Sequence, residues 1–575
     1  MTGRIRLCFV AGLCAVAAIG AQAQHKPLPP TTVPGIDSVK RRTETKAIAL
    51  PEYTITGADM IRLREGGKEA LDAFDPSALV ARAGRGIREL PEGAPALTQP
   101  VLGQPLLLGR AGNLFARATL GLFATPALDV RAAQQFEHGD AFARAALERS
   151  NGHTDHADRS SASIEGGGGS FLPATLPAFF ARSRVEGQVS AEYRAYSLYG
   201  DRIDPGSPAL LFSRKRSGFS FSSGLISRQN RIVDHNIVFG VEHTNLREGL
   251  AVADSFTVPE SRFADTRVQV SARARTRLRG FPLEGGLEAS IDYVRAPSGL
   301  ATTRPFFLAG SARSQWWIRP DLSLDGGLAL TLYRGSNSAA QGRIYPDLEL
   351  RYYWDADLSV AAAVTPRVER VTYHGIFDEN PYTSLDAELR HDDIPVAIAL
   401  SARFDDRRRL AFDVSAEYRE YATHGVFIRS SEPYATQWDV RYPGRASIFT
   451  LHSDAQWQAT RLDRVAAFVE LRSSYIRALD AAVPYLPAFE LHGVYTRGFD
   501  IPLEVQAGLR LLGPRTADAV TLASTVLVDV QAEYRFTPYA ATYASVQNIF
   551  GSRWERYRGY SERPLFLAAG ITVRL

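Results

Sequence analysis

Apolar and polar residues alternate along most of this chain, and the last stretch shows the pattern most clearly. Between Val528 and Phe536 every second residue is apolar, and charged or amide side chains stand between them. A strand with this pattern has one apolar face and one polar face. After a turn at Thr537-Pro538 a second extended segment follows, and the chain ends on an alternating run from Leu565 to Leu575. The pattern predicts antiparallel strands that finish at the last residue.

The same pattern recurs from about Asn113 onward. Pairs of alternating runs flank short polar turns at residues 279–282, 319–321, 355–357, 405–409 and 497–502. Longer segments, at residues 334–343, 374–381, 423–445 and 551–564, separate these hairpins. Transmembrane barrels have short turns at one end and long loops at the other. The regularity favours a barrel over a soluble β-sandwich.

Aromatic residues support the same choice because they gather beside the short turns. A girdle at one membrane interface requires this placement, whereas a soluble sandwich would scatter aromatic residues through its core. We therefore predict an all-β fold, a transmembrane antiparallel β-barrel of about 20 to 22 strands over residues 113–575. The aromatic residues concerned are Phe281, Trp316, Trp317, Tyr352, Tyr353, Trp354, Phe404, Phe499, Phe536 and Tyr539.

Composition agrees with a barrel. Hydrophobic residues make up 45% of the chain, and the mean hydropathy is -0.14. Average hydropathy stays low in a barrel because only every second strand residue faces lipid. Without the two arginines of residues 1–23, the formal charge is 64 minus 62, or +2. Such an even balance gives no nucleic-acid footprint.

The first 23 residues predict export through the Sec pathway. Arg4 and Arg6 precede an apolar run over residues 7–20, and Ala21-Gln22-Ala23 supplies a cleavage site. Cys8 and Cys14, the two cysteines of the chain, lie within this signal peptide, so the mature chain needs no disulfide. Lipid attachment at Cys14 is disfavoured because the usual small residue before the cysteine is missing. Residues 24–112 begin rich in proline and then in charge, which predicts a short, flexible periplasmic segment.

Both ends of the predicted barrel resemble a known family. The run Ala544-Ser-Val-Gln-Asn-Ile-Phe-Gly551, followed by Trp554, Tyr557 and Tyr560, resembles the closing strands of TonB-dependent receptors. Residues 116–150 resemble the first hairpins of a plugless group similar to these receptors. Gly570, Val573 and Leu575 fit the spacing of the signal that the barrel assembly machinery reads, although aromatic residues are commoner at the last two positions.

The resemblance implies an outer-membrane protein of a Gram-negative bacterium that takes up a small solute. It also implies outer-membrane lipid, the assembly machinery and a TonB-type energy-coupling protein as partners. Such receptors carry a short coupling box and then a plug domain before the barrel. The segment Glu52, Tyr53, Thr54, Ile55, Thr56 and Gly57 is loosely similar to that box, and a short strand is the other interpretation. Too few residues follow for a complete plug, so we expect the plug to be absent or reduced.

Two loop features invite chemical interpretations. His153, Asp155, His156 and Asp158 offer metal-binding side chains, but no regular spacing aims them together, which favours a solvated loop. The glycines at 166–169 lack the lysine of a phosphate-binding loop and are interpreted as a flexible connection. The longer segment 151–181 is a candidate for a loop that folds into the barrel. We expect no cofactor and no metal site.

Charged residues on the polar faces of the strands are predicted to point into the lumen. A wall of mutually paired charges is the expected arrangement, and a catalytic set is not, so we predict that the protein is not an enzyme. A passive porin-like channel and a structural or surface-binding barrel stay open as alternatives, and a barrel enzyme with a rim His or Asp is the least favoured. The inward-facing residues are Glu417, Arg419, Glu470, Arg472, Glu504, Arg510, Asp529, Glu533 and Arg535.

Overall fold

A computed structural model describes most of the chain from residue 113 to its end. The described ranges are 113–177, 179–181, 183–200, 212–227, 233–250, 260–278, 281–297, 304–406, 409–430, 436–517 and 520–575. All of them belong to Leu79–Leu575, the second of the two units into which the chain divides. The predicted signal peptide, the reduced plug and the coupling-box-like segment 52–57 lie outside these residues.

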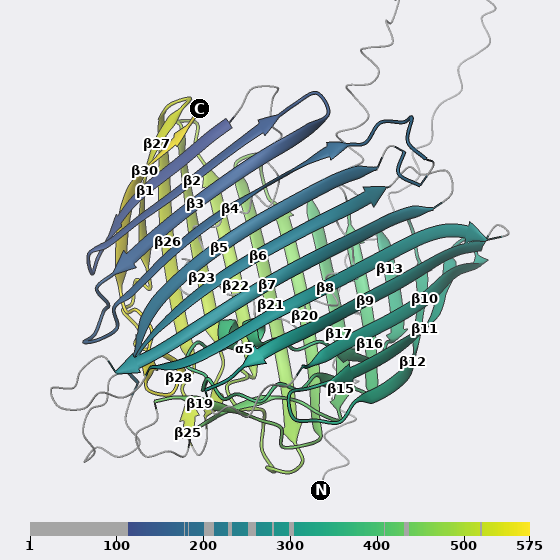
Figure 1. Cartoon of the computed structure of the whole chain (residues 1–575). Coiled ribbons are helices and arrows are strands. Elements are labelled where there is room, and N and C mark those ends of the chain that lie inside the picture. The colour runs from purple at the N-terminus through teal and green to yellow at the C-terminus, as the bar shows by residue number, and fades with distance from the viewer. Residues whose placement is uncertain are drawn as a thin grey trace, which may run out of the picture. The chain divides into compact units, whose positions relative to one another are not determined.

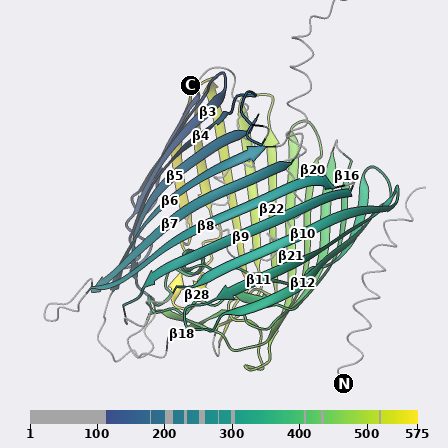
Figure 2. The same cartoon turned by 45° about the vertical axis from the view of Figure 1, so that its right-hand side comes forward.

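The described residues form one closed antiparallel barrel of 22 strands (Figures 1 and 2). Each wall strand pairs with the next in the chain, and β1 pairs with β30 to close the wall. The predicted fold class is therefore confirmed, at the upper predicted strand number. The wall strands are β1 Asn113–Gly121, β2 Thr125–Gln135, β3 Gly139–Ser150, β4 Arg159–Phe171, β5 Arg184–Leu198, β6 Phe212–Ser227, β7 Asp234–Leu250, β8 Ser261–Leu278, β9 Phe281–Arg295, β10 Phe306–Arg319, β11 Leu322–Arg334, β12 Gln341–Tyr353, β13 Leu358–Val364, β16 Val396–Asp405, β17 Leu410–Tyr421, β20 Ala446–Gln458, β21 Asp463–Ile476, β22 Phe489–Gly498, β23 Leu503–Leu512, β26 Thr525–Thr537, β27 Ala540–Gln547 and β30 Phe566–Arg574.

The last residue takes part in the closure of the barrel. The backbone N–H of Leu114 donates to the carbonyl of Leu575 at 2.9 Å, and the N–H of Leu575 donates back at 2.8 Å. Gly570 lies in the same seam, under the ring of Tyr543, and a Cβ atom there would come within 2.7 Å of that ring. The glycine of the C-terminal spacing thus has a packing reason, because any larger residue would displace the tyrosine.

The alternation places apolar side chains on the outer face. Leu328, Leu330 and Leu332 of β11 are all exposed, as the lipid-facing side of a transmembrane strand requires. The short turns are held by side-chain oxygens. Asp355 Oδ1, for example, accepts from the backbone N–H groups of Asp357 and Leu358 at 2.8 and 2.7 Å. Asp and Asn favour turns because they replace a backbone acceptor in this way.

The longer loops gather at the end of the barrel opposite to the short turns, which is the lower end in Figure 1. They add four small hairpins and one α-helix, α5 (Tyr373–Glu379), to the described part of the chain. The described residues of all four segments predicted as long loops lie at this end. The hairpin strands are β14 Arg367–Glu369, β15 Asp392–Ile394, β18 Val426–Arg429, β19 Trp438–Arg441, β24 Arg515–Ala517, β25 Val520–Leu522, β28 Glu555–Tyr557 and β29 Tyr560–Ser561.

One prediction about the loops is wrong. The segment 151–181 does not fold into the barrel as a loop, because β4 spans Arg159–Phe171 and belongs to the wall. The glycines 166–169 lie within β4 and pair with both neighbouring strands. Close backbone approach explains them: a Cβ atom at Gly168 would lie 2.3 Å from the carbonyl oxygen of Asp140.

No helix within the described ranges is long and apolar enough to cross a membrane.

Candidate functional site

The loop between β13 and β16, residues 365–395, lies inside the lumen and carries α5. Thr372 caps the helix, since its Oγ1 accepts from the backbone N–H of Gly375 at 3.0 Å. The helix ends at Asn380, whose backbone N–H donates to the carbonyl of Ile376. Tyr373, Ile376 and Phe377 are buried. A short helix of this kind depends on tertiary packing, because its own hydrogen bonds are too few to hold it.

Apolar contacts fix this loop to one side of the wall. Tyr373 and Phe377 pack in one cluster with Leu246, Phe263 and Val294 of β7, β8 and β9. A second cluster joins Val368 of the loop to Phe307 and Tyr333 of β10 and β11. The loop therefore covers the inner face of β7–β11 at the end of the barrel that carries the long loops.

Buried charges fix the loop as well. Arg214 of β6 is fully buried, and it forms an ion pair with Glu248 of β7. Its Nη1 donates to the carbonyl oxygens of Pro381 and Thr383 at 2.6 and 2.8 Å. One guanidinium thus holds a wall carboxylate and two loop carbonyls together.

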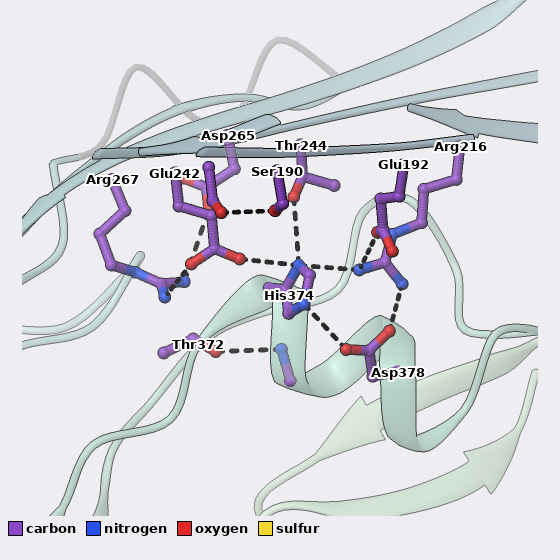
Figure 3. A network of polar contacts seen from close by, with 12 residues as sticks. Ser190, Glu192, Arg216, Glu242, Thr244, Asp265, Arg267, Thr372, His374 and Asp378 are labelled. Atoms are coloured by element: carbon purple, nitrogen blue, oxygen red, sulfur yellow. Dashed lines mark hydrogen bonds and ion pairs between the residues drawn. The ribbon is translucent and has the colours of Figure 1, made fainter. Parts of the chain in front are cut away.

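His374 lies at the centre of a second set of contacts between α5 and the wall (Figure 3). Its Nε2 is 2.9 Å from Asp378 Oδ2 on the next turn of the helix. Its Nδ1 lies 2.8 Å from both Glu242 Oε1 and Arg216 Nη2, and one nitrogen cannot serve both as donor and as acceptor. A doubly protonated imidazole donates to Glu242 and Asp378, and Arg216 Nη1 donates to Asp378 Oδ1 at 2.6 Å.

The pKa values of the two loop groups agree with this assignment. Burial by itself would lower the pKa of His374, but hydrogen bonds to Asp378 and Glu242 outweigh it and raise the pKa to about 9. Burial would raise the pKa of Asp378, but His374 and Arg216 outweigh it and lower the pKa well below its usual range. At neutral pH the contact is therefore an ion pair.

Aromatic side chains from five loops and two aliphatic side chains from a sixth form a cap over the outer end of the lumen. Trp438 is fully buried at its centre, and its Nε1 donates to Tyr485 Oη at 3.1 Å. Tyr382 of the internal loop stacks on Tyr560 with ring centroids 3.5 Å apart, and Tyr560 Oη donates to the carbonyl of Thr436 at 2.8 Å. The cap consists of Tyr199, Tyr382, Phe427, Trp438, Tyr485, Ala517, Leu522, Tyr557 and Tyr560.

Beneath the cap lies a cavity of about 1270 Å³. Strands β1–β5 and strands β17–β30 supply its walls, and the internal loop borders it through residues such as Val371 and Asp378. No described residue of β6–β13 lines it, because the internal loop covers that side. At the level of α5 the cavity thus lies on one side of the barrel, whereas nearer the short turns the inward side chains of Arg275 and Glu284 in β8 and β9 are exposed.

The cavity is lined by many charges, as the alternation predicted. Among its described lining residues are nine arginines and twelve aspartates or glutamates. Of the residues predicted to face inward, Arg419, Glu470, Arg472, Arg510 and Asp529 line it directly. Most inward charges are paired as expected. The pairs include Arg419 with Glu417, Arg472 with Glu470, Glu533 with Arg117, and Arg535 with Glu533, while Glu504 stands beside Glu533 in the strand register.

The histidine and aspartate cluster of the β3–β4 loop does not converge on one point. His153 borders the cavity and lies 3.2 Å from Ser561 Oγ of the β27–β30 loop. Burial lowers the pKa of His153, so the neutral imidazole prevails at neutral pH. No group of three or more metal-ligating side chains that could hold an ion occurs within the described ranges.

Sequence reasoning missed the internal loop. The segment 374–381 was predicted as part of an external loop, although Tyr373, Ile376 and Phe377 have helical spacing after a capping threonine. That pattern was the available signal for α5. Its inward position depends on Arg214 and Arg216, which stand more than 150 residues away and carry no local signal.

Comparison with known proteins gives matches in structure alone. No family model matches the sequence, and no curated protein matches it. The FrpB iron transporter from Neisseria meningitidis, in its F3-3 variant, has a TM-score of 0.63 at 9% identity, over 81% of this chain and 82% of that one. The copper transporter OprC has a TM-score of 0.62 at 12% identity, over 81% and 80%. The fold is that of TonB-dependent receptors.

A further solved structure agrees. A mutant of the ferric enterobactin receptor PfeA from Pseudomonas aeruginosa, in complex with enterobactin, has a TM-score of 0.60 at 11% identity, over 81% of each chain. The resemblance that the closing strands suggested is therefore confirmed at the level of the fold. The solved proteins named here are transporters or receptors, and none of them is an enzyme by its title.

Proposed function

We propose that the protein takes up a solute across the outer membrane through the cavity beneath the aromatic cap. The observation that carries the proposal is a closed 22-strand barrel that encloses about 1270 Å³ under interlocked loops. The similar solved proteins transport copper or iron, or receive ferric enterobactin, which favours a small solute of this kind. In this mechanism the cap loosens to admit the solute, and the charged wall provides a polar path through the lipid.

The partners follow from the same proposal. Residues 1–23 direct export through the Sec pathway, residues 24–112 remain in the periplasm as a reduced plug or coupling segment, and residues 113–575 are embedded in outer-membrane lipid. The barrel assembly machinery reads the C-terminal strand. A TonB-type protein binds the segment Glu52–Gly57 and supplies the energy for uptake.

The closed cap and the paired wall favour this proposal over its alternatives. A passive porin-like channel needs a lasting opening at both ends, and the packed aromatic cap with the buried Trp438 and Tyr560 disfavours one at the outer end. An enzyme needs a few reactive groups released from other contacts, whereas Glu417, Glu470 and Glu490 all form ion pairs with arginines.

Uptake in cells tests the proposal. Deletion strains complemented with the wild-type chain should accumulate labelled iron or copper chelates faster than the deletion strain. A chain lacking residues 52–57 should lose this gain, and a chain lacking residues 40–45 should keep it. Unchanged uptake without residues 52–57 would refute energy coupling, and steady conductance of the purified protein in planar bilayers would establish a passive channel instead.

A further inference from the structure

Most carboxylates that line the cavity already have cationic partners. Glu148 accepts from Arg159 at 3.0 Å and from Arg563 at 3.1 Å. Glu490 lies 2.9 Å from His492 and 3.6 Å from Arg472. The excess of carboxylates over arginines therefore does not make the cavity wall an open site for cations.

Arg510 of β23 is an arginine of the cavity wall without such a partner. Within the described part of the chain, its guanidinium donates no hydrogen bond and has no carboxylate oxygen within 4.0 Å. The acidic groups around it are engaged elsewhere. Glu490 is held by His492, and Asp529 Oδ1 accepts from the backbone N–H of Asn548 at 2.7 Å.

Arg515 of β24, a short distance along the chain, is also uncompensated. The residue is 5% exposed, and its guanidinium donates to the backbone carbonyls of Glu555 and Arg556 at 2.7 and 3.5 Å, while its Nε has no hydrogen-bond partner. No carboxylate oxygen of the described residues lies within 4.0 Å of it. Burial lowers the pKa of Arg515, and repulsion from Arg556 lowers it further. A buried guanidinium without an anion is unfavourable, and a bound anion would relieve the cost.

Arg556 links the two positions electrostatically. It lines the same cavity, and its charge repels both Arg510 and Arg515. Glu490 attracts both arginines, but no carboxylate of the described residues comes within ion-pair distance of either one. The guanidinium groups of Arg510 and Arg515 thus both border the cavity without an anion in contact. Guanidinium forks match oxyanions because they present parallel N–H donors to two oxygens.

We propose that Arg510 and Arg515 form an anion-binding site in the cavity for a carboxylate, phosphate or similar oxyanion group of the solute. The inference rests on the proposed uptake function, because it states the charge of the molecule that enters. Most charges of the described cavity lining are paired with each other, so they contribute little to the choice of solute. The two arginines then retain solutes that carry an anionic group.

Calorimetry on the purified mature chain in detergent tests the site, with citrate and pyrophosphate as probes. At least one probe should bind to the wild-type chain. Arg510→Gln and Arg515→Gln should each weaken this binding about tenfold or more, because each removes a charge-assisted hydrogen bond. Arg159→Gln is the matched control, since Glu148 keeps Arg563, and its effect should stay within about threefold.

Arg515 is buried, so folding needs its own check. Arg515→Lys retains the charge and should keep binding within about fivefold. Migration of unheated samples in detergent gels reports whether each variant forms the barrel. Trp554 gives a second readout, because the guanidinium of Arg515 lies 5.8 Å from its ring. Its fluorescence should change on titration, and Trp554→Phe should remove the change while calorimetry still detects binding.

Three results would overturn the site: no binding of either probe, unaltered binding in both glutamine variants, or an equal loss in Arg159→Gln. Measurements of solute uptake in cells distinguish failure of the anion site from failure of the proposed transport function. If a solute is taken up equally by the wild type and by both glutamine variants, the anion site is wrong and the transporter stands. If the probes bind as expected but no uptake occurs, the site stands and the transport function is wrong.

Discussion

His374 is the positively charged residue through which α5 contacts the barrel wall. Its imidazole contacts Glu242 on the adjacent wall strand β7 and Asp378 on its own helix, at 2.8 and 2.9 Å. Because its pKa in the folded state, about 9, lies above the ordinary value of 6.5, its protonation stabilises the folded loop. This contribution is fully present below about pH 6.5 and is lost as the pH rises through 9. The other charges around the contact are Glu192, Arg194, Arg216, Asp265 and Arg267.

An NMR titration of the histidines checks this assignment. In the full chain with labelled histidine, the His374 signal, identified by its loss in His374→Gln, should titrate near pH 9. Asp378→Asn should lower that pKa toward 6.5, because it removes one of the two hydrogen-bonded carboxylates. Asp439→Asn, which removes a carboxylate paired with the exposed Arg441 instead, should leave the pKa of His374 unchanged and serves as the control. Titration of His374 below pH 7 in the wild type would show that the ion pair does not form.

The internal loop occupies part of the lumen, and the fully buried Arg214 is one of its attachments to the wall. Arg214→Met removes a buried cation and leaves Glu248 and the carbonyls of Pro381 and Thr383 without it. Breaking one partner of a buried pair costs about 3 kcal/mol or more. Hydrogen exchange of peptides covering residues 381–389 should therefore accelerate by about 100-fold or more, since local opening becomes easier by that amount.

The control for this prediction is an exposed ion pair on the neighbouring wall. Arg262 lies 2.9 Å from Glu260, and its side chain is 64% exposed. Arg262→Met should leave exchange of the same peptides within about threefold, because exposed pairs contribute little. Equal exchange in the two variants would mean that the apolar contacts of α5 alone hold the loop.

At the level of elements, local pattern predicted the wall well and the lumen poorly. Alternation assigns a strand and its outward face, since both follow from neighbouring residues such as Leu328 and Leu330. It failed at β4, where four successive glycines hide the alternation although each backbone still pairs. It also could not place α5, whose position rests on contacts across the barrel with Arg214 and Arg216. Arg510 was correctly predicted to face inward, but its lack of a partner required the structure.

For the whole molecule, the arrangement of the internal loop and the cavity predicts that a solute crosses the lumen along one side of the barrel. The internal loop covers the inner face over β7–β11, and the cavity lies against β1–β5 and β17–β30. At the level of the loop, a solute that crosses the lumen should therefore contact β1–β5 and β17–β30 and not β7–β11. If the loop instead swung out of the lumen during transport, both sides would become accessible.

Cysteine labelling distinguishes these outcomes, because the mature chain is expected to hold no cysteine of its own. Ser163 of β4 lines the cavity, whereas Thr331 of β11 is buried on the covered side. A charged, membrane-impermeant thiol reagent should modify Ser163→Cys rapidly in outer-membrane preparations and should modify Thr331→Cys at least about 100-fold more slowly. Both variants should react fully after denaturation, which controls for the reagent. When Arg214→Met is combined with Thr331→Cys, the rate of labelling at the cysteine should rise, because the loop that shields it has lost the hydrogen bonds from Arg214. Fast labelling of Thr331→Cys in the otherwise wild-type chain would show that the loop leaves the wall, and the path would then use the whole lumen.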